Sequence, residues 1–300
     1  MTTQSKKAKA FRALHQRTGA FVIPNPWDPG TARLLAHLGF EALATTSAGF
    51  AFSQGRPDGG VTREDTMAHV RAIVAATELP VSADLEGGFG DDPKDCAETI
   101  RQGAASGLVG GSIEDSTGRK DDPIYKHDLA VERVRAVVAA ARSLPFPFTL
   151  TARSENFLWG RPDLADTIKR LQAFQDAGAD VLYAPGLKTR EEITTLIRAV
   201  DRPVNVLAGI PGALSVAELA EIGVKRISVG GALARAALGA FMIAAKEMRD
   251  SGTSPSLKAA CRGASSTRSS QGRRRSARKI SLRGHGMLLK LHQLQPGRSV

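Results

Sequence analysis

Three acidic residues stand at the ends of two consecutive apolar runs, and their spacing suggests that they act together. Asp84 and Glu86 end the run "PVSADLE", and Glu114 ends the next run, "LVGGSIED". Residues two apart on a strand face the same way, and neighbouring parallel strands end at the same edge of a sheet. Carboxylates that meet there raise one another's pKa unless a cation neutralises them.

Two kinds of cation can fill that role. Because the set contains oxygen ligands without Cys or His, it favours a hard metal ion, Mg²⁺ or Mn²⁺, that keeps several waters. The alternative is a salt-bridge network with Lys residues or with Arg153, which ends the run "FTLTARS". A guanidinium at that place can also hold a substrate carboxylate through two parallel hydrogen bonds.

Small residues follow another strand-like run. Ser47, Ala48 and Gly49 begin the stretch "SAGFAFSQGRPDGG", and their backbone N–H groups can approach an anionic oxygen closely. A tight turn explains the same residues. Asp58, further along this stretch, is either a catalytic residue or a turn residue at the entry to a helix.

Two more runs end in side chains suited to contact a substrate, namely Trp27 after "FVIPN" and Asn205 within "PVNVLAG". The segment "SVGGALARAA" resembles the phosphate-binding turn of many barrels. Close packing of a helix against its strand explains its glycines equally well.

The elements that must position these residues form a regular series. Eight β-rich runs alternate with amphipathic patterns, after an opening helix near 4–18; the patterns lie at about 30–38, 62–77, 93–106, 129–143, 163–177, 189–200, 215–222 and 231–249. This alternation predicts a (β/α)8 barrel, in which catalytic groups come from the carboxyl ends of the strands. A doubly wound open sheet is the alternative, although no GxGxxG or Walker loop opens any helix.

The composition is that of a globular protein of 300 residues, with 42% hydrophobic and 24% charged residues. No apolar run approaches the roughly 20 residues that span a bilayer, and the basic N-terminus lacks the apolar region of a secretory signal. Two cysteines, Cys96 and Cys261, make no disulfide framework and fit a reducing cytoplasm. We therefore expect a cytoplasmic protein without a membrane partner.

The net charge of +11 is unevenly placed. Residues 251–300 contain eleven Lys or Arg and no Asp or Glu, so residues 1–250 are balanced. We predict a catalytic domain over 1–250 and a basic, largely disordered tail over 251–300. The tail is expected to be a dispensable extension or the product of an altered reading frame. A nucleic-acid-binding arm is the alternative, but the tail has no aromatic side chains to stack on bases.

Five stretches carry a family resemblance: "NPWDPGTARLLAHLGFEALATTSAGFA", "RPDGG", "SADLEGGFGDDP", "GGSIEDSTGRKDDPIY" and "TARSENFLWGRPDLADTIKRLQAFQDAGADVLYAPG". Over about residues 8–250 the chain resembles the isocitrate lyase and phosphoenolpyruvate mutase superfamily. The resemblance implies an α/β barrel, a homotetramer built as a dimer of dimers, and an eighth helix exchanged with a neighbouring subunit. It also implies Mg²⁺ or Mn²⁺, and chemistry that makes or breaks a C–C or C–P bond next to a 2-oxo acid through an enolate.

The resemblance assigns roles by position. It implies that the metal-site acids, some acting through water, are Asp84, Glu86 and Glu114. The loop that binds the substrate carboxylate and oxo group corresponds to Ser47 with the backbone of Ala48 and Gly49. Arg153 corresponds to the arginine that holds the substrate, and Asp58 to the acid of the strand-2 loop. We expect Asp58, Arg153 and Glu114 to be catalytic, with Trp27 and Asn205 also contacting the substrate.

One difference from the family pattern limits the reactions that the sequence favours. Members that cleave isocitrate or methylisocitrate carry a cysteine in a "KxCGH" segment, which here reads "STGRKDDPIYKHD". The sequence therefore favours an oxaloacetate decarboxylase-like or phosphonopyruvate hydrolase-like enzyme acting on a small 2-oxo or 2-hydroxy acid. The alternatives are a methylisocitrate- or isocitrate-type lyase, and a non-catalytic barrel whose basic tail binds a polyanion.

Overall fold

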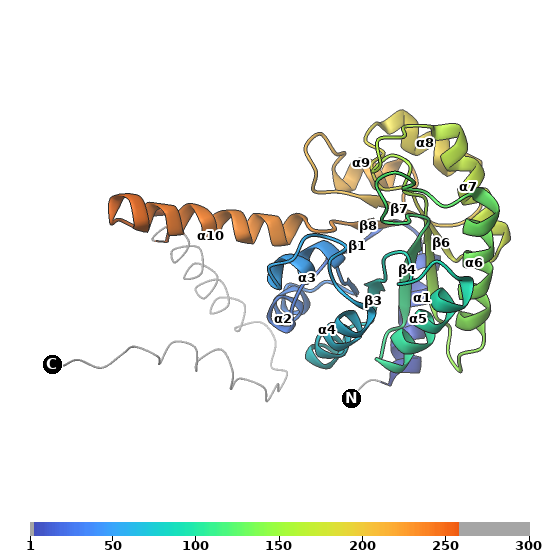
Figure 1. Cartoon of the computed structure of the whole chain (residues 1–300), viewed down its shortest axis with the longest axis horizontal. Coiled ribbons are helices and arrows are strands. Elements are labelled where there is room, and N and C mark those ends of the chain that lie inside the picture. Colours follow the sequence, from blue (N-terminus) through green and yellow to red (C-terminus); the bar gives the residue numbers. More distant parts are fainter. Residues whose placement is uncertain (1–2, 258–300) are drawn as a thin grey trace. The chain divides into compact units, whose positions relative to one another are not determined.

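A computed structural model describes residues 3–257 and shows eight parallel strands surrounded by helices (Figure 1). The strands are β1 (Phe21–Ile23), β2 (Leu43–Ala44), β3 (Val81–Asp84), β4 (Gly110–Glu114), β5 (Thr149–Arg153), β6 (Val181–Tyr183), β7 (Val204–Leu207) and β8 (Arg226–Ser228). Each strand from β2 to β7 pairs with the next one in the chain, and β8 pairs with β1.

The barrel closes between β1 and β2 without a regular ladder. The N–H of Ala44 donates to the carbonyl of Pro24 at 3.1 Å. The side-chain amide of Asn25 then donates to the carbonyl of Thr45 at 3.0 Å. These bonds join the two strands at their carboxyl ends, so the predicted (β/α)8 barrel is confirmed and the open sheet is excluded.

The helices lie close to the predicted patterns. They are α1 (Gln4–Gln16), α2 (Pro29–His37), α3 (Ser47–Ser53), α4 (Arg63–Ala76), α5 (Pro93–Ala105), α6 (His127–Arg142), α7 (Leu164–Asp176), α8 (Arg190–Ala199), α9 (Val216–Glu221) and α10 (Ala232–Ser251). Only α3 falls outside the predicted patterns. It forms because the side chain of Thr46 accepts the N–H of Gly49 and caps a short run of small residues.

Apolar side chains fill the layer between the strands and the helices. Two large clusters make up most of this core, with Ile100 and Leu150 in one and Phe174 and Ile227 in the other. Helix α1 covers the amino ends of the strands and buries Phe11 completely. The free thiol of Cys96 is buried on α5, whereas Cys261 lies outside the described residues.

Polar contacts cross the inside of the barrel. Arg226 of β8 donates to the hydroxyl of Thr151 on β5 at 2.9 Å, and Arg153 of β5 lies 2.9 Å from Asp84 on β3. Neither pair of strands is adjacent in the sheet. The side chains therefore meet across the interior, where they leave room for a polar site at the carboxyl end.

The chain divides into two compact units, Met1–Leu238 and Gly239–Val300, and the division falls within α10. The first unit contains the whole barrel. In the second, Phe241, Ile243 and Met248 of α10 are exposed. Residues 258–300 of the predicted tail lie outside the described part, so its disorder and the boundary at residue 250 stay predictions. Within residues 3–257, no helix is both long and apolar enough to cross a bilayer.

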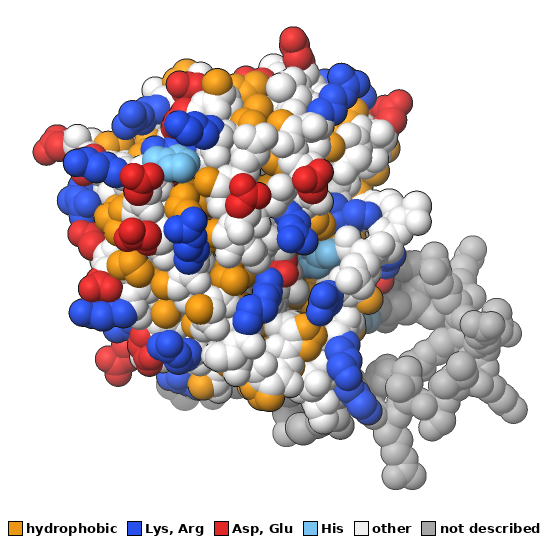
Figure 2. All heavy atoms as spheres, turned by 90° about the vertical axis from the view of Figure 1, so that its right-hand side faces the viewer, with side chains coloured by type: hydrophobic (Ala, Val, Ile, Leu, Met, Phe, Trp, Pro, Cys, Tyr) orange, Lys and Arg blue, Asp and Glu red, His pale blue; other side chains and the backbone are white. Residues whose placement is uncertain are grey.

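The surface of the barrel unit carries charges of both signs. Figure 2 shows Lys and Arg side chains interspersed with Asp and Glu over one face, with no broad field of a single sign. This pattern agrees with the balanced charge of residues 1–250. On this face the surface gives no sign of the continuous basic patch that nucleic acid requires.

Replacement of Gly110 tests how closely β4 is packed. A Cβ atom here would lie 2.8 Å from both the carbonyl oxygen of Thr149 and a ring carbon of Phe11. We expect Gly110→Ala to reduce the free energy of unfolding by about 1–3 kcal/mol, since overpacking forces the backbone to move. Thermal and urea denaturation measure the change. Gly239→Ala is the control because a Cβ there meets nothing within 4 Å, and equal effects of both substitutions would contradict the prediction.

Candidate active site

Two cavities of about 560 Å³ each lie at the carboxyl ends of the strands and share Ser47, Asp58, Arg153 and Leu158. We call one the acidic cavity, whose charged lining comprises Asp58, Glu86, Asp91, Glu114, Glu155 and Arg153. We call the other the basic cavity, whose charged lining comprises Asp58, Asp84, Arg153, Lys188, Arg226 and Arg235. A third cavity of about 690 Å³ lies at the amino ends of the strands, away from where barrel enzymes carry their chemistry.

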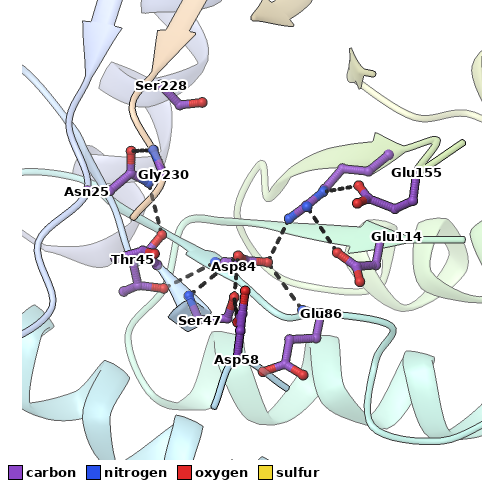
Figure 3. A network of polar contacts seen from close by, with 12 residues as sticks. Asn25, Thr45, Ser47, Asp58, Asp84, Glu86, Glu114, Glu155, Ser228 and Gly230 are labelled. Atoms are coloured by element: carbon purple, nitrogen blue, oxygen red, sulfur yellow. Dashed lines mark hydrogen bonds and ion pairs between the residues drawn. The ribbon is translucent and has the colours of Figure 1, made fainter. Parts of the chain in front are cut away.

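Arg153 uses all three guanidinium nitrogens on carboxylates. Its partners Asp84, Glu114 and Glu155 are labelled in Figure 3. Its Nη1 lies 2.9 Å from Asp84 Oδ1, its Nη2 3.1 Å from Glu114 Oε2, and its Nε 2.8 Å from Glu155 Oε1. The Arg153 side chain is only 12% exposed, so these contacts are weakly screened. The salt-bridge network that the sequence left as an alternative to a metal site is thus present.

Burial is the largest cause of the raised pKa values of the glutamates in this cluster. It raises the pKa of Glu114 well above its ordinary value and also raises that of Glu155, while the nearby Arg153 charge opposes both shifts. Burial, followed by the charges of Asp84 and Asp58, raises the pKa of Glu86 to about 8. One oxygen of Glu86 is buried without a hydrogen-bond partner. The cluster therefore carries more negative charge than Arg153 alone can balance when every carboxyl is ionised.

Ser47 joins the two cavities at the amino end of α3. Its hydroxyl lies 3.0 Å from Asp84 Oδ2 and 3.2 Å from Asp58 Oδ1. A hydroxyl has one hydrogen to donate, so a protonated Asp58 can donate to Ser47 while Ser47 donates to Asp84. Burial and then the Asp84 charge raise the pKa of Asp58, which favours this arrangement.

The loop after β3 brings Glu86 to the site in a way that the sequence did not predict. Strand β3 ends at Asp84, Leu85 is fully buried, and the backbone of Glu86 is left-handed with φ of 49°. The expectation that Asp84 and Glu86 face the same way along a strand is wrong, since Glu86 lies beyond it. A turn joins them instead, in which the N–H of Glu86 donates to Asp84 Oδ1 at 3.3 Å.

Arg133 of α6 holds this strained loop in place. It is 1% exposed, and its guanidinium donates to the carbonyl oxygens of Gly87, Gly90 and Asp91. The guanidinium also lies 4.0 Å from the centre of the Tyr125 ring. A buried cation that binds three carbonyls fixes the loop conformation and, with it, the left-handed backbone at Glu86.

The remaining predicted site residues differ in their placement. Ala48 lines the basic cavity, whereas Gly49 does not and gives its N–H to the Thr46 cap. Asn205 lines neither cavity and donates to the hydroxyl of Ser228, which does line the basic one. Trp27 also lines neither, and its carbonyl is bonded to His69. Substrate contacts by Trp27, Gly49 and Asn205 stay predictions.

The sequence reasoning gave no role to several residues that line the site. Glu155 was recognisable, because it lies two residues beyond Arg153 at the same strand end. Arg226 was not, because it begins β8, whereas barrel sites are expected at the carboxyl ends of strands. Lys188 and Arg235 lie on segments after β6 and β8 and have no local pattern that indicates a site.

Asp84 of the basic cavity and Glu86 and Glu114 of the acidic cavity fit a metal ion that keeps several waters better than one held by protein ligands alone. Within residues 3–257, no three His, Cys, Asp or Glu side chains form a ready-made metal-binding group. Asp84 and Glu114 direct oxygens to Arg153. Mg²⁺, however, usually takes one or two carboxylates and keeps its waters. The unpartnered oxygen of Glu86 and the second oxygen of Asp84 provide donors of that kind.

Comparisons with known proteins agree with this architecture. The family model described as phosphoenolpyruvate phosphomutase matches residues 11–249. A crystal structure from Burkholderia cenocepacia J2315, provisionally named a lyase/mutase, is 64% identical, with a TM-score of 0.83. The match covers 85% of this chain and 92% of that one.

Two curated relatives have similar coverage. An uncharacterized protein of Mycobacterium tuberculosis is 34% identical over 80% of this chain and 89% of its own length. The oxaloacetate decarboxylase of Paraburkholderia xenovorans is 29% identical over 83% of this chain and 81% of its own length. The similarity thus extends over the entire barrel.

Removal of the Arg153 charge should destabilise the fold in a pH-dependent way. Without it, the folded-state pKa values of Glu114 and Glu155 rise further above 4.5, so stability falls as the pH rises above that value. We expect Arg153→Leu to cost ~3–5 kcal/mol at pH 8 and clearly less at pH 5. Urea denaturation at both pH values measures the difference.

Arg17→Leu is the control, since Arg17 pairs with an exposed Glu41. Its effect should be small and nearly independent of pH. If Arg153→Leu reduces the free energy of unfolding equally at pH 5 and pH 8, the prediction is wrong, because the pKa values of Glu114 and Glu155 then do not depend on this guanidinium.

Proposed function

The chain belongs to the phosphoenolpyruvate phosphomutase family, and on that premise we propose that it cleaves a carbon–carbon bond to C3 of a small 2-oxo acid, the carbon beside the oxo group. It is an enzyme of the isocitrate lyase and phosphoenolpyruvate mutase superfamily, whose members include an oxaloacetate decarboxylase. The observation that carries the proposal is the buried Arg153 among carboxylates, beside Ser47 and Asp58, at the carboxyl end of the barrel.

The chemistry requires that negative charge be stabilised as it forms. When the bond to the departing carbon breaks, its electron pair passes into the remaining 2-oxo acid and produces an enolate. A fixed cation at the enolate oxygen stabilises the transition state more than the ground state. Arg153 supplies such a charge, and its carboxylate partners prevent it from turning away.

Ser47 and Asp58 have the two remaining roles, substrate binding and proton transfer. Ser47, with the backbone of Ala48, binds the substrate carboxylate at the start of α3. The enolate carbon must then take up a proton to give the product. Asp58 holds one at higher pH than an ordinary carboxyl, and we assign it as the general acid.

Asp84, Glu86 and Glu114 would hold Mg²⁺ or Mn²⁺, some of them through water. The metal would supply a second positive charge for the oxo group and the enolate oxygen. It would also provide the countercharge that the cluster requires. Glu114 keeps its contact with Arg153 in this assignment and orients it toward the substrate.

The position of Cys96 argues against its serving as the cysteine of isocitrate-type cleavage. Cys96 is buried on α5 and contacts the carbonyl of Gly87, and it lines neither cavity. Burial also raises its thiol pKa, which disfavours the thiolate. We therefore place oxaloacetate first among substrates and include phosphonopyruvate, because cleavage of its C–P bond produces the same enolate.

Activity is tested with oxaloacetate and with phosphonopyruvate in Mg²⁺, by following pyruvate. We expect Arg153→Met and Asp58→Asn each to reduce kcat by about 10²-fold or more, as for loss of a charge-stabilising group or a general acid. Glu41→Gln, on the exposed surface, should keep full activity. Unchanged turnover in both site variants would overturn the proposed roles.

Metal binding is tested separately from turnover. Mg²⁺ should raise the melting temperature of the wild-type protein, since a ligand that binds only the folded state stabilises it. We expect Glu86→Gln and Asp84→Asn to reduce that shift. Differential scanning fluorimetry with and without EDTA measures it, and an absent shift in the wild-type protein would contradict a metal site here.

We further propose that the exposed apolar side chains of α10 pack against a second copy of the chain. Phe241 is 66% exposed, Ile243 59% and Met248 56%. Apolar side chains exposed to this degree on one helix favour a surface that another protein chain covers. The exchange of the eighth helix implied by the family resemblance would cover them, within a dimer of dimers.

Disruption of this surface should change the oligomeric state. We expect Phe241→Asp to reduce the mass measured by light scattering after gel filtration. Lys246→Glu on the same helix changes the charge without removing an apolar side chain and should leave the mass unchanged. A monomeric wild-type protein would refute the assembly.

A further inference from the structure

One buried acid beside the site, Asp115, has no part in the proposed chemistry. It follows Glu114, is 3% exposed and lines neither cavity. Its Oδ1 accepts the backbone N–H of Glu155 at 2.8 Å, and its own N–H donates to the carbonyl of Arg153 at 3.2 Å. Asp115 thus contacts the backbone of the two residues whose side chains pair inside the site, Arg153 and Glu155.

Arg170 of α7 is buried beside Asp115 and balances its charge. Its Nη1 lies 3.3 Å from Asp115 Oδ2, and its Nε lies 2.7 Å from Asp166 Oδ2. Nη1 also donates to the carbonyl of Tyr125 at 2.9 Å. Burial raises the pKa of Asp115 to about 7, whereas the Glu155 N–H and then the Arg170 charge favour its carboxylate form. These contacts fix the orientation of the Asp115 side chain.

The residue after Glu155 is attached to the same arginine. Asn156 is 2% exposed, and its side-chain amide donates to Asp166 Oδ2 at 2.8 Å. Asp166 therefore accepts hydrogen bonds from Arg170 and Asn156 together. Residues 155 and 156 are both bonded to acids that share Arg170, and neither acid lines a cavity. The loop after β5 is thus fixed by residues that do not contact a ligand in either cavity.

Stability alone is a weak reason for this buried group of charges. A buried ion pair often gives no more stability than apolar residues of the same volume. Its position indicates another reason, because the Glu155 carboxylate lies 2.8 Å from Arg153 Nε. A shift of the Glu155 backbone would move that carboxylate and turn the guanidinium. Misplacement of a reacting group by about 1 Å can cost as much as ~10²-fold in rate.

We propose that Asp115 is a positioning residue for the reaction, which acts on Arg153 through Glu155 and is itself fixed by Arg170. It does not contact the substrate. The order of dependence is specific, since Arg170 orients Asp115, Asp115 fixes the Glu155 backbone, and the Glu155 carboxylate orients Arg153. This inference rests on the proposed function, because it concerns how the Arg153 charge is directed to the enolate oxygen.

A double-mutant cycle on kcat, measured with oxaloacetate and Mg²⁺, tests this order. We expect Asp115→Leu and Glu155→Met each to reduce kcat about tenfold, because Arg153 loses its orientation. The double variant should also lose about tenfold rather than a hundredfold, since Asp115 has no carboxylate left to position. Asp115→Asn should recover most of the kcat that Asp115→Leu loses, because its amide oxygen can still accept the Glu155 N–H.

Arg170→Gln provides a second cycle in case Asp115→Leu does not fold. It removes the group that fixes Asp115 and leaves the Asp115 side chain in place. We expect it to reduce kcat less than Asp115→Leu does, and to cause no further loss when it is combined with Glu155→Met. Melting temperatures identify the variants that are folded.

Asp180→Leu is the matched control, because Asp180 makes the same two kinds of contact near the amino end of β5. Its Oδ2 accepts the N–H of Leu150 at 2.8 Å, and its Oδ1 lies 2.7 Å from Arg142. We expect Asp180→Leu to lower the melting temperature and to keep kcat within twofold of wild type. A stability effect and a positioning effect are thereby separated.

Three results would overturn the inference and leave the proposed function standing. They are wild-type kcat in the folded Asp115 and Arg170 variants, losses that multiply in the double variants, and an equal loss of kcat in Asp180→Leu. A wild-type protein that turns over no 2-oxo acid with Mg²⁺ would overturn both the inference and the proposed function.

Discussion

The ion pairs between Arg153 and the carboxylates of Asp84, Glu114 and Glu155 tie together three strands at the carboxyl end of the barrel. Each partner alone would be costly to bury as a charged group. Together they form a cluster with one cation and three carboxylates, so removal of Arg153 leaves all three carboxylates without an ion-pair partner within the cluster. The positions of Ser47 and Asp58 depend on it as well, since Ser47 bonds to the same Asp84 that Arg153 holds.

The loop that follows β3 depends on a second buried arginine. Arg133 binds three carbonyls of the loop, and the loop in turn carries Glu86 in a left-handed conformation. The two arginines have different functions. Arg153 balances side-chain charge within the site, whereas Arg133 satisfies backbone oxygens behind it, and together they fix both the charge and the shape of the acidic cavity.

Much of this arrangement could be predicted from the sequence. Alternation of strand and helix patterns predicted the barrel, and Thr62 and Ser215 cap two helices that lie within the predicted patterns. Asp84, Glu114 and Arg153 could be predicted as site residues because each ends a strand, and the carboxyl ends of all strands lie at one end of a barrel. Local patterns could not reveal contacts across the barrel. Arg226 begins its strand and reaches the cavity only because the barrel interior is polar, and Glu86 reaches its place through a turn rather than a strand.

The bonds that close the barrel between β1 and β2 also affect which residues of the site can be substituted without loss of the fold. Asn25 joins the end of β2 to the turn after β8, and its side chain thereby occupies the backbone N–H groups of Val229 and Gly230. A single side chain therefore closes the barrel between β1 and β2 and fixes the turn that precedes α10. Lys188 and Arg235 are exposed side chains that no structural contact described above requires. Single substitutions at these two positions can therefore reshape the lining of the basic cavity while the bonds of Asn25 that close the barrel stay intact.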